Sequence, residues 1–171
     1  MQNWSKNVDF NDRDFLQPGS LAELQEMVRL NQKIRARGTA HSFNEIANTS
    51  SYAINLAKMP RVIEVNSEKS SVRVVAGLTY GELAPVLHSQ GWALNNLASL
   101  PHISIAGSIS TGTHGSGIKN QNLANQVLSL DLVTAEGELR HIDRTNPAFN
   151  ALVVGLGLGG IVYQYELKIE P

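Results

Sequence analysis

Gly38-Thr-Ala-His-Ser-Phe-Asn-Glu-Ile-Ala47 is the stretch of this 171-residue chain that decides its fold. It directly follows a short β-rich segment, Lys33 to Ala36, so the sequence predicts a strand that runs into a loop. The loop combines glycine, hydroxyl groups and a histidine, and it can present several backbone N–H groups toward one point, as phosphate-binding loops do. Because binding residues are concentrated in loops, this stretch is the first candidate for a site.

A second stretch has the same chemistry: Ser99-Leu-Pro-His-Ile-Ser-Ile-Ala-Gly-Ser-Ile-Ser-Thr-Gly-Thr-His114-Gly. It is rich in hydroxyls and small residues, and it contains no carboxylate. The surrounding region, Leu97 to Lys119, has no sustained hydrophobic period, so we expect it to be irregular. Two loops of this kind predict a large phosphate-containing cofactor that lies between them.

The rest of the chain alternates helix and strand signals. Capping boxes at Ser20–Glu23 and Thr79–Glu82 predict two helices, the first ending near Gln32 and the second at Gly91, with an irregular start because Pro85 lies inside it. A further helix is predicted at Asn146-Pro147. Strands are predicted around Tyr52–Leu56 and Ile161–Ile169, and hairpins at Val62–Val65 with Val72–Ala76 and at Val127–Val133 with Glu138–Ile142. The prediction is an α+β fold in two subdomains, residues 1–77 and 78–171.

Composition excludes several functional classes. The chain has 14 Lys+Arg and 15 Asp+Glu, a net charge of -1, so attraction to nucleic acid or an anionic membrane is disfavoured. It has no cysteine, which excludes disulfides and thiol catalysis. No apolar run approaches the roughly 20 residues of a membrane helix, and the N-terminal residues lack the features of a signal peptide. We therefore expect a cytoplasmic protein.

Three short motifs have plainer interpretations. Gly155-Leu-Gly-Leu-Gly-Gly160 satisfies G-x-G-x-x-G, but a strand rather than a helix follows it, so a tight turn is favoured over a dinucleotide-binding fold. Gly112-Thr-His-Gly-Ser-Gly-Ile-Lys119 is a poor match to a phosphate-binding P-loop. The five histidines lack zinc-ligand spacing, so no metal site is expected.

Three stretches resemble one family: Gly38–Ala47, Leu97–Ser108 and Thr111–Gly117. The chain resembles the FAD-binding (PCMH-type) domain of the vanillyl-alcohol oxidase class of flavoproteins, and within that class the alditol (xylitol) oxidases. The resemblance covers essentially the whole chain. Proteins of this family are more than twice as long, and their other half is a substrate-binding domain that this sequence does not contain.

The resemblance implies a set of FAD-binding residues. The first loop would hold the pyrophosphate, His41 takes the place of the histidine bonded covalently to the flavin 8α-methyl, and Ser99 takes that of the serine near the reactive flavin edge and the substrate. The cofactor-binding positions it implies are Ala36, Arg37, Gly38, Thr39, Ala40, His41, Ser42, Ser99, Ser104, Gly107, Ser108, Ile109, Ser110, His114, Gly160 and Ile161.

The resemblance also implies a reaction and its partners. Alditol oxidases oxidise a terminal alcohol of a polyol to an aldehyde, with O2 as the electron acceptor and H2O2 as a product. The groups that activate the alcohol belong to the other domain of such proteins, so we expect this chain alone to be inactive. Three alternatives stay open: the flavin domain of a sugar-1,4-lactone oxidase, a stand-alone flavin-binding module without turnover, and a glycine-rich domain without a cofactor.

Overall fold

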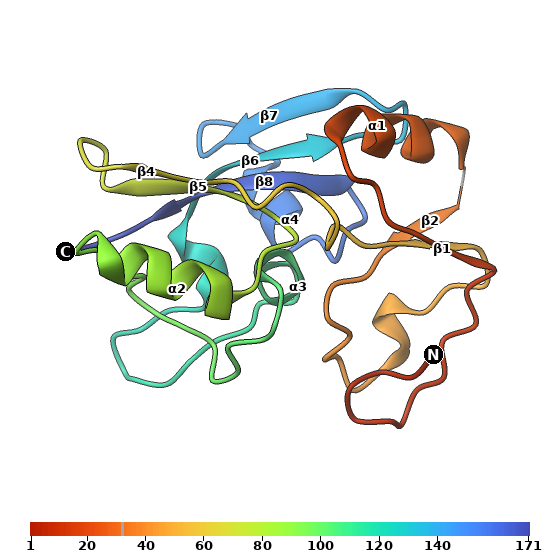
Figure 1. The fold of residues 1–171 in the computed structure, drawn as a ribbon, viewed down its shortest axis with the longest axis horizontal. Helices are drawn as coiled ribbons and strands as arrows, with labels where there is room; N and C mark the ends of the chain where they lie inside the picture. Colours follow the sequence, from red (N-terminus) through yellow and green to blue (C-terminus); the bar gives the residue numbers. More distant parts are fainter. Residues whose placement is uncertain (32) are drawn as a thin grey trace.

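Two β-sheets and several short helices form the structure, a computed structural model that describes residues 1–31 and 33–171 (Figure 1). The strands are β1 (Asp14–Leu16), β2 (Ile34–Ala36), β3 (Tyr52–Ile54), β4 (Ile63–Asn66), β5 (Ser71–Val75), β6 (Val127–Val133), β7 (Leu139–Asp143) and β8 (Ile161–Lys168). The helices are α1 (Leu21–Leu30), α2 (Tyr80–Ser89), α3 (Ile105–Ser110) and α4 (Phe149–Val153), with 3-10 turns η1 (Glu45–Ala47) and η2 (Leu123–Gln126). The predicted α+β class is confirmed.

The smaller sheet is parallel and has the strand order β1-β3-β2. Helix α1 connects β1 to β2, and its start follows the predicted cap because Ser20 Oγ accepts a hydrogen bond from the Glu23 N–H at 3.2 Å. The Glu23 carboxylate accepts from Gly19 N–H instead of from Ser20, so only half of the capping box forms. The helix ends at Leu30; its predicted end, near Gln32, lies outside the described residues.

The larger sheet is antiparallel, with the order β4-β5-β8-β6-β7. Both predicted hairpins are present, and β8 lies between them, hydrogen-bonded to β5 on one side and to β6 on the other. Tyr165 and Leu167 of β8 are buried, so the predicted alternation of this strand is confirmed. Buried side chains of β5, β6 and β8 form the centre of the core.

The sheets divide the chain earlier than the sequence suggested. Strands β4 and β5 were expected in the subdomain of residues 1–77, but β5 pairs with β8 through Val72 and Leu167, so both strands join the larger sheet. The change from one sheet to the other therefore lies between Ile54 and Ile63. The pairing of β5 with the distant strand β8 sets the position of this change between the sheets, and no local signal in the sequence indicates that pairing.

Three elements also differ from the expected ones. Helix α3 lies inside the region that was expected to be irregular. Helix α4 begins two residues after Pro147, because Asn146 Oδ1 accepts from the Ala148 N–H and closes a turn before the helix starts. Helix α2 starts regularly at Tyr80, with both bonds of its capping box present, and Pro85 lies in its interior.

The helices flank the larger sheet. In Figure 1, α2 and α3 lie below this sheet, while α1 lies beside β6 and β7. Gln25 of α1 donates from Nε2 to the Gly137 carbonyl in the β6–β7 turn at 2.8 Å, which ties the two sheets together. Within residues 1–31 and 33–171, no helix has both the length and the apolar character to cross a bilayer.

Candidate functional site

The loop after β2, residues 37–43, forms one wall of the site. Ala40 has a φ of 58°, a left-handed conformation that is uncommon for a residue with a side chain. The Arg37 N–H continues the sheet with a 2.9 Å bond to the Ile54 carbonyl, but among the described residues the N–H groups of residues 38–42 have no protein acceptor. Successive free N–H groups beside a left-handed residue form an anion-binding concavity.

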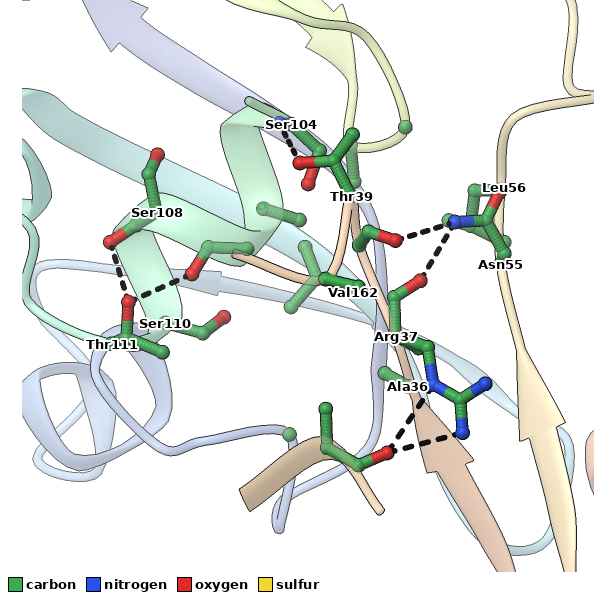
Figure 2. A pocket seen from close by; sticks show the side chains of 18 of the residues that line it. Ala36, Arg37, Thr39, Asn55, Leu56, Ser104, Ser108, Ser110, Thr111 and Val162 are labelled. Carbon is green, nitrogen blue, oxygen red and sulfur yellow. Dashed lines mark hydrogen bonds between the residues drawn. The ribbon is translucent and has the colours of Figure 1, made fainter. Parts of the chain in front are cut away.

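Asn55, directly after β3, holds this loop from the side. Its Nδ2 donates to the carbonyls of Arg37 at 2.7 Å and Gly38 at 3.0 Å (Figure 2). Its Oδ1 accepts from the Ala57 N–H at 2.7 Å, which fixes the amide orientation. Asn55 therefore bonds two carbonyls at the start of the loop and uses none of the N–H groups of residues 38–42.

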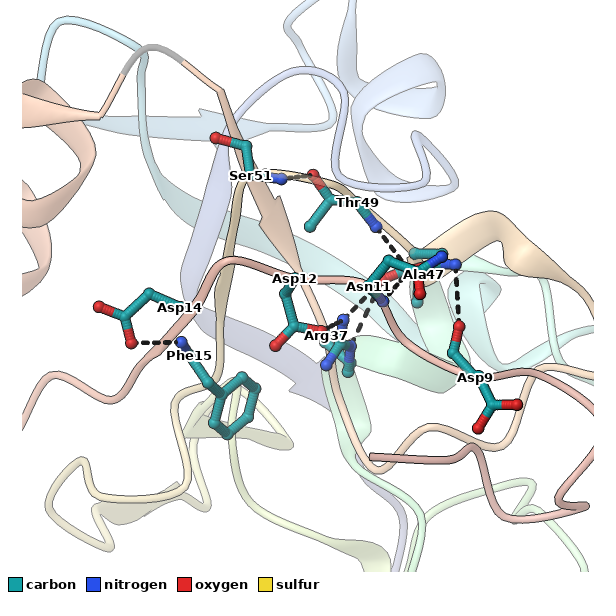
Figure 3. A network of polar contacts seen from close by, with 10 residues as sticks. Asp9, Asn11, Asp12, Asp14, Phe15, Arg37, Ala47, Thr49 and Ser51 are labelled. Carbon is teal, nitrogen blue, oxygen red and sulfur yellow. Dashed lines mark hydrogen bonds and ion pairs between the residues drawn. The ribbon is translucent and has the colours of Figure 1, made fainter.

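The guanidinium group of Arg37 pairs with Asp12 and does not face the ligand space. Its side chain is fully buried, and Nη2 lies 2.7 Å from Asp12 Oδ1 (Figure 3). The guanidinium also lies over the Phe10 ring, 3.6 Å from its centroid. Burial raises the pKa of Asp12, but the hydrogen bond and the charge of Arg37 outweigh it and hold this pKa below its usual value. Arg37 therefore offers the cavity its backbone rather than its cation.

Helix α3 and the residue before it, Ser104, form the opposite wall. The Ser104 N–H donates to Thr39 Oγ1 at 3.2 Å, so the two walls are in contact (Figure 2). A Cβ at Gly38 would lie 2.2 Å from Ser104 Oγ, and one at Gly107 would lie 2.7 Å from the same atom. Glycine at position 38 lets the walls meet, and glycine at position 107 leaves room for the Ser104 hydroxyl within its own wall. Ser104 Oγ is buried and has no hydrogen-bond partner among the described residues.

Between these walls lies a cavity of about 360 Å³, in the size range of small-molecule sites. Most of the residues singled out from the sequence line it. They are Ala36, Arg37, Gly38, Thr39, Ala40, His41, Ser42, Ser104, Gly107, Ser108, Ser110, Gly160 and Ile161. The structure therefore brings together three segments that are distant in sequence: the loop after β2, the region of α3 and the turn before β8.

Three residues singled out from the sequence are not among the lining residues. Ile109 points into the core and is fully buried, because α3 turns that position away from the cavity. Ser99 is exposed, in the loop that precedes α3. His114 is also exposed, and its Nδ1 lies 2.9 Å from the Gly115 carbonyl oxygen.

Sequence reasoning missed a further part of the lining. It includes Asn55, Leu56, Ala57, Arg61, Ala76, Gly77, Thr79, Thr111, Thr113 and Val162. One of them carried a usable signal: Gly77 directly follows a β-rich segment, and a Cβ there would lie 2.3 Å from the Leu56 carbonyl oxygen. The others, which include Val162 of β8 and the α2 cap Thr79, are brought to the cavity only by the tertiary fold.

The ring of His41 lies between two other rings. Its centroid is 5.1 Å from that of Trp4, with the planes 28° apart, and 4.7 Å from that of His102. Burial, together with the nearby His102, lowers the pKa of His41 below its usual value. The imidazole is therefore predominantly neutral near pH 7, with one ring nitrogen carrying a free lone pair.

The charges around the cavity favour an anion. Arg35 and Arg61 line it, Arg37 contributes its backbone, and the described lining residues include no carboxylate. The Arg35 guanidinium donates to the Ile46 carbonyl, while Arg61 forms a partly exposed ion pair with Glu82 at 3.1 Å. Deeper in the wall, the Tyr80 hydroxyl lies 3.0 Å from Ser108 Oγ. Burial raises the pKa of Tyr80 to about 12, so this hydroxyl stays protonated.

Comparisons with known proteins agree with this geometry. A family model described as "FAD binding domain" matches residues 14–143. An alditol oxidase from Streptomyces sp. is 40% identical over 172 residues, which is 99% of this chain and 41% of that protein. The L-gulonolactone oxidase of Mus musculus is 36% identical over 176 residues, 99% of this chain and 40% of that protein.

A third relative is a dehydrogenase. The mitochondrial L-galactono-1,4-lactone dehydrogenase of Brassica oleracea is 34% identical over 174 residues, 98% of this chain and 29% of that protein. The chain thus spans about two fifths of the length of the first two relatives. The family match covers well over half of the chain, so FAD is the cofactor of this fold, and the chain belongs to the family of FAD-binding domains.

Proposed function

We propose that this chain binds FAD in an extended pose within the cavity between the two sheets. The observation that carries the proposal is the run of unbonded N–H groups in residues 38–42, beside the left-handed Ala40. Such a concavity suits the two negatively charged phosphates of FAD. Ser104 Oγ, buried and without a partner among the described residues, supplies a further hydrogen bond from the opposite wall.

The remaining contacts follow from the same arrangement. The loop of residues 38–42 and Ser104 would hold the pyrophosphate, and the turn at Gly160 and Ile161 would approach the adenine end. We further propose that the two sheets correspond to the two subdomains of the fold. Ser99 and His114 lie outside the cavity lining, so their contacts with substrate or cofactor stay predictions.

We propose that the whole protein is an oxidoreductase that oxidises a terminal alcohol group of a polyol with O2. FAD, when bound, supplies the electron acceptor for such a reaction. The relative that is an alditol oxidase supports this substrate class. Within this chain, His41 is the residue we propose for covalent attachment to the flavin, because its neutral imidazole has a nucleophilic nitrogen.

A second candidate is oxidation of a sugar lactone. Two relatives that are lactone oxidases or dehydrogenases, at 36% and 34% identity, favour it. Both candidates use the same flavin cavity. A flavin-binding module without turnover is the remaining alternative, and a cytoplasmic location stays a prediction from the sequence.

Titration of the purified chain with FAD tests the binding proposal directly. We expect flavin fluorescence to change saturably with FAD, and riboflavin to bind far more weakly because it lacks the phosphates that the loop would hold. Equal affinity for both ligands, or no binding of FAD, would remove the pyrophosphate role of residues 38–42.

Substrate class is tested on the FAD-loaded chain without oxygen. We expect xylitol and an aldonolactone both to leave the flavin oxidised, because the described lining of the cavity has no carboxylate to act as a general base, and His41 is the residue we propose for attachment to the flavin. Bleaching by xylitol would show that this chain is itself an alditol oxidase, and bleaching by the lactone alone would favour the second candidate.

A further inference from the structure

The first twelve residues of the chain lie against the outer side of the loop of residues 37–43, and none of them lines the cavity. They form neither a helix nor a long strand. The segment closes on itself instead, through bonds from the Asn3 N–H to the Val8 carbonyl at 3.1 Å and from the Phe10 N–H to the Met1 carbonyl at 2.9 Å. Residues 3–12 are called the N-terminal clasp below.

The clasp bonds to three carbonyl groups of the loop. The Trp4 N–H donates to the Ala40 carbonyl at 2.9 Å. Asn3 Nδ2 donates to the Ser42 carbonyl at 2.8 Å, and Asn7 Nδ2 donates to the Phe43 carbonyl at 2.8 Å. These bonds use loop carbonyls and leave the N–H groups of residues 38–42 without a protein acceptor among the described residues.

The clasp also contacts both ends of the loop through side chains. At the first end, Asp12 pairs with the buried Arg37 at 2.7 Å (Figure 3). Near the other end, the Trp4 ring is stacked on the ring of His41. The loop therefore meets the clasp at its start, at its left-handed residue and at its histidine.

We propose that the N-terminal clasp holds the loop of residues 37–43 in its binding shape, and that Trp4 is a positioning residue that fixes the His41 ring. The left-handed Ala40 is the reason such a device is needed, because a residue with a side chain adopts this conformation only when its surroundings enforce it. The bond from Trp4 to the Ala40 carbonyl acts at that residue. The inference rests on the proposed function, since the loop matters only if it binds the cofactor.

Geometry distinguishes positioning from general stabilisation. Trp4 is 54% exposed, so removal of its side chain takes little from the hydrophobic core. The Trp4 ring stacks on the His41 ring, and His102, from the loop that precedes α3, also contacts the His41 ring. A purely structural tryptophan would be expected to bury more of its surface.

The test compares Trp4→Leu, Trp4→Phe and, as a matched control, Asp9→Asn, an exposed residue of the same segment. The first measurement uses the ligand-free chain: the NMR signals of the His41 ring nitrogens, with His88 as a reference for an exposed histidine. We expect Trp4→Leu to move the His41 signals toward those of His88, Trp4→Phe to restore most of the difference, and Asp9→Asn to change nothing. Thermal unfolding confirms that each variant is folded.

The second measurement is the affinity for FAD. Stacking between aromatic rings corresponds to about a threefold to tenfold effect on an equilibrium, so Trp4→Leu should weaken FAD binding by about that factor and Trp4→Phe by less. Unchanged His41 signals in a folded Trp4→Leu chain would overturn the inference. Failure of the unaltered chain to bind FAD would instead overturn the proposed function, since the ring signals are read without FAD.

Discussion

At the scale of single residues, the site depends on a contact between its two walls. Gly38 and Gly107 both face Ser104 Oγ at distances that no Cβ could keep. The glycines of such sites are commonly explained by the approach of a ligand to the backbone. Here a Cβ at either position would also displace the Ser104 hydroxyl, even without a ligand.

Gly38→Ala should therefore reduce stability as well as FAD binding. The new Cβ would lie 2.2 Å from Ser104 Oγ, and overpacking of this kind costs about 1–3 kcal/mol. The double variant Gly38→Ala with Ser104→Ala removes the clashing oxygen, so we expect it to recover most of the unfolding free energy measured in urea. Ser104→Ala alone is the control, and a double variant no more stable than Gly38→Ala would refute the steric explanation.

The second residue-scale prediction concerns pH. Burial and the nearby His102 lower the pKa of His41 below its ordinary value of 6.5. As the pH falls below 6.5, the unfolded chain takes up this proton before the folded chain does, so stability falls with pH in that interval and is complete above it. An NMR titration should give His41 a pKa below 6.5, and His102→Gln should raise it. A value at or above 6.5 in the unaltered chain would contradict this account.

At the scale of elements, a helix could be predicted from the sequence only where its signal lies within a few consecutive residues. Helix α2 was found because its capping box lies within four consecutive residues, Thr79 to Glu82. Helix α3 was missed because it has only six residues, IAGSIS, too few for a helical period to show. Its fully buried Ile105 and Ile109 indicate that docking against the core stabilises it.

Helix α2 carries a removable defect. Pro85 lies in its interior and lacks the N–H that would bond to the carbonyl four residues earlier, a loss that costs up to about 3 kcal/mol in a helix. Pro85 is exposed, so Pro85→Ala should leave the core unchanged and raise the unfolding free energy by about 1 kcal/mol or more. Thermal and urea unfolding measure this, with Ala84→Gly as a control of opposite sign. A less stable Pro85→Ala chain would mean that the proline ring makes a contact worth more than the missing bond.

At the scale of the whole molecule, the sequence located the loop of residues 36–42 but not the surface that completes the cavity. The composition of the loop, with its glycine, hydroxyl groups and histidine, was enough to identify it. Residues such as Asn55 and Gly77 reach the cavity only because β3 and β5 belong to different sheets that meet there. The change from one sheet to the other between Ile54 and Ile63 was not predicted for the same reason, since strand pairing over long separations leaves no local signal in the sequence.

Because the cavity joins segments of both sheets, its ligand should stabilise the whole chain. A ligand at a hundred times its Kd adds about 2.7 kcal/mol to the unfolding free energy. We expect FAD to raise the unfolding temperature in one cooperative transition, with ADP giving part of the shift and riboflavin little. Differential scanning calorimetry checks this. Two separated transitions with FAD, only one of them shifted, would show that the ligand contacts a single sheet.

The position of β8 has a consequence for folding during synthesis on the ribosome. During translation both hairpins, β4–β5 and β6–β7, leave the ribosome before β8, yet β8 lies between them in the finished sheet. Until residues 161–168 emerge, each nascent hairpin displays an unpaired edge, which is the feature that invites aggregation. Chaperone demand should therefore peak just before residues 161–168 emerge, and a ribosome paused before Ile161 should hold a chain that proteases cut readily.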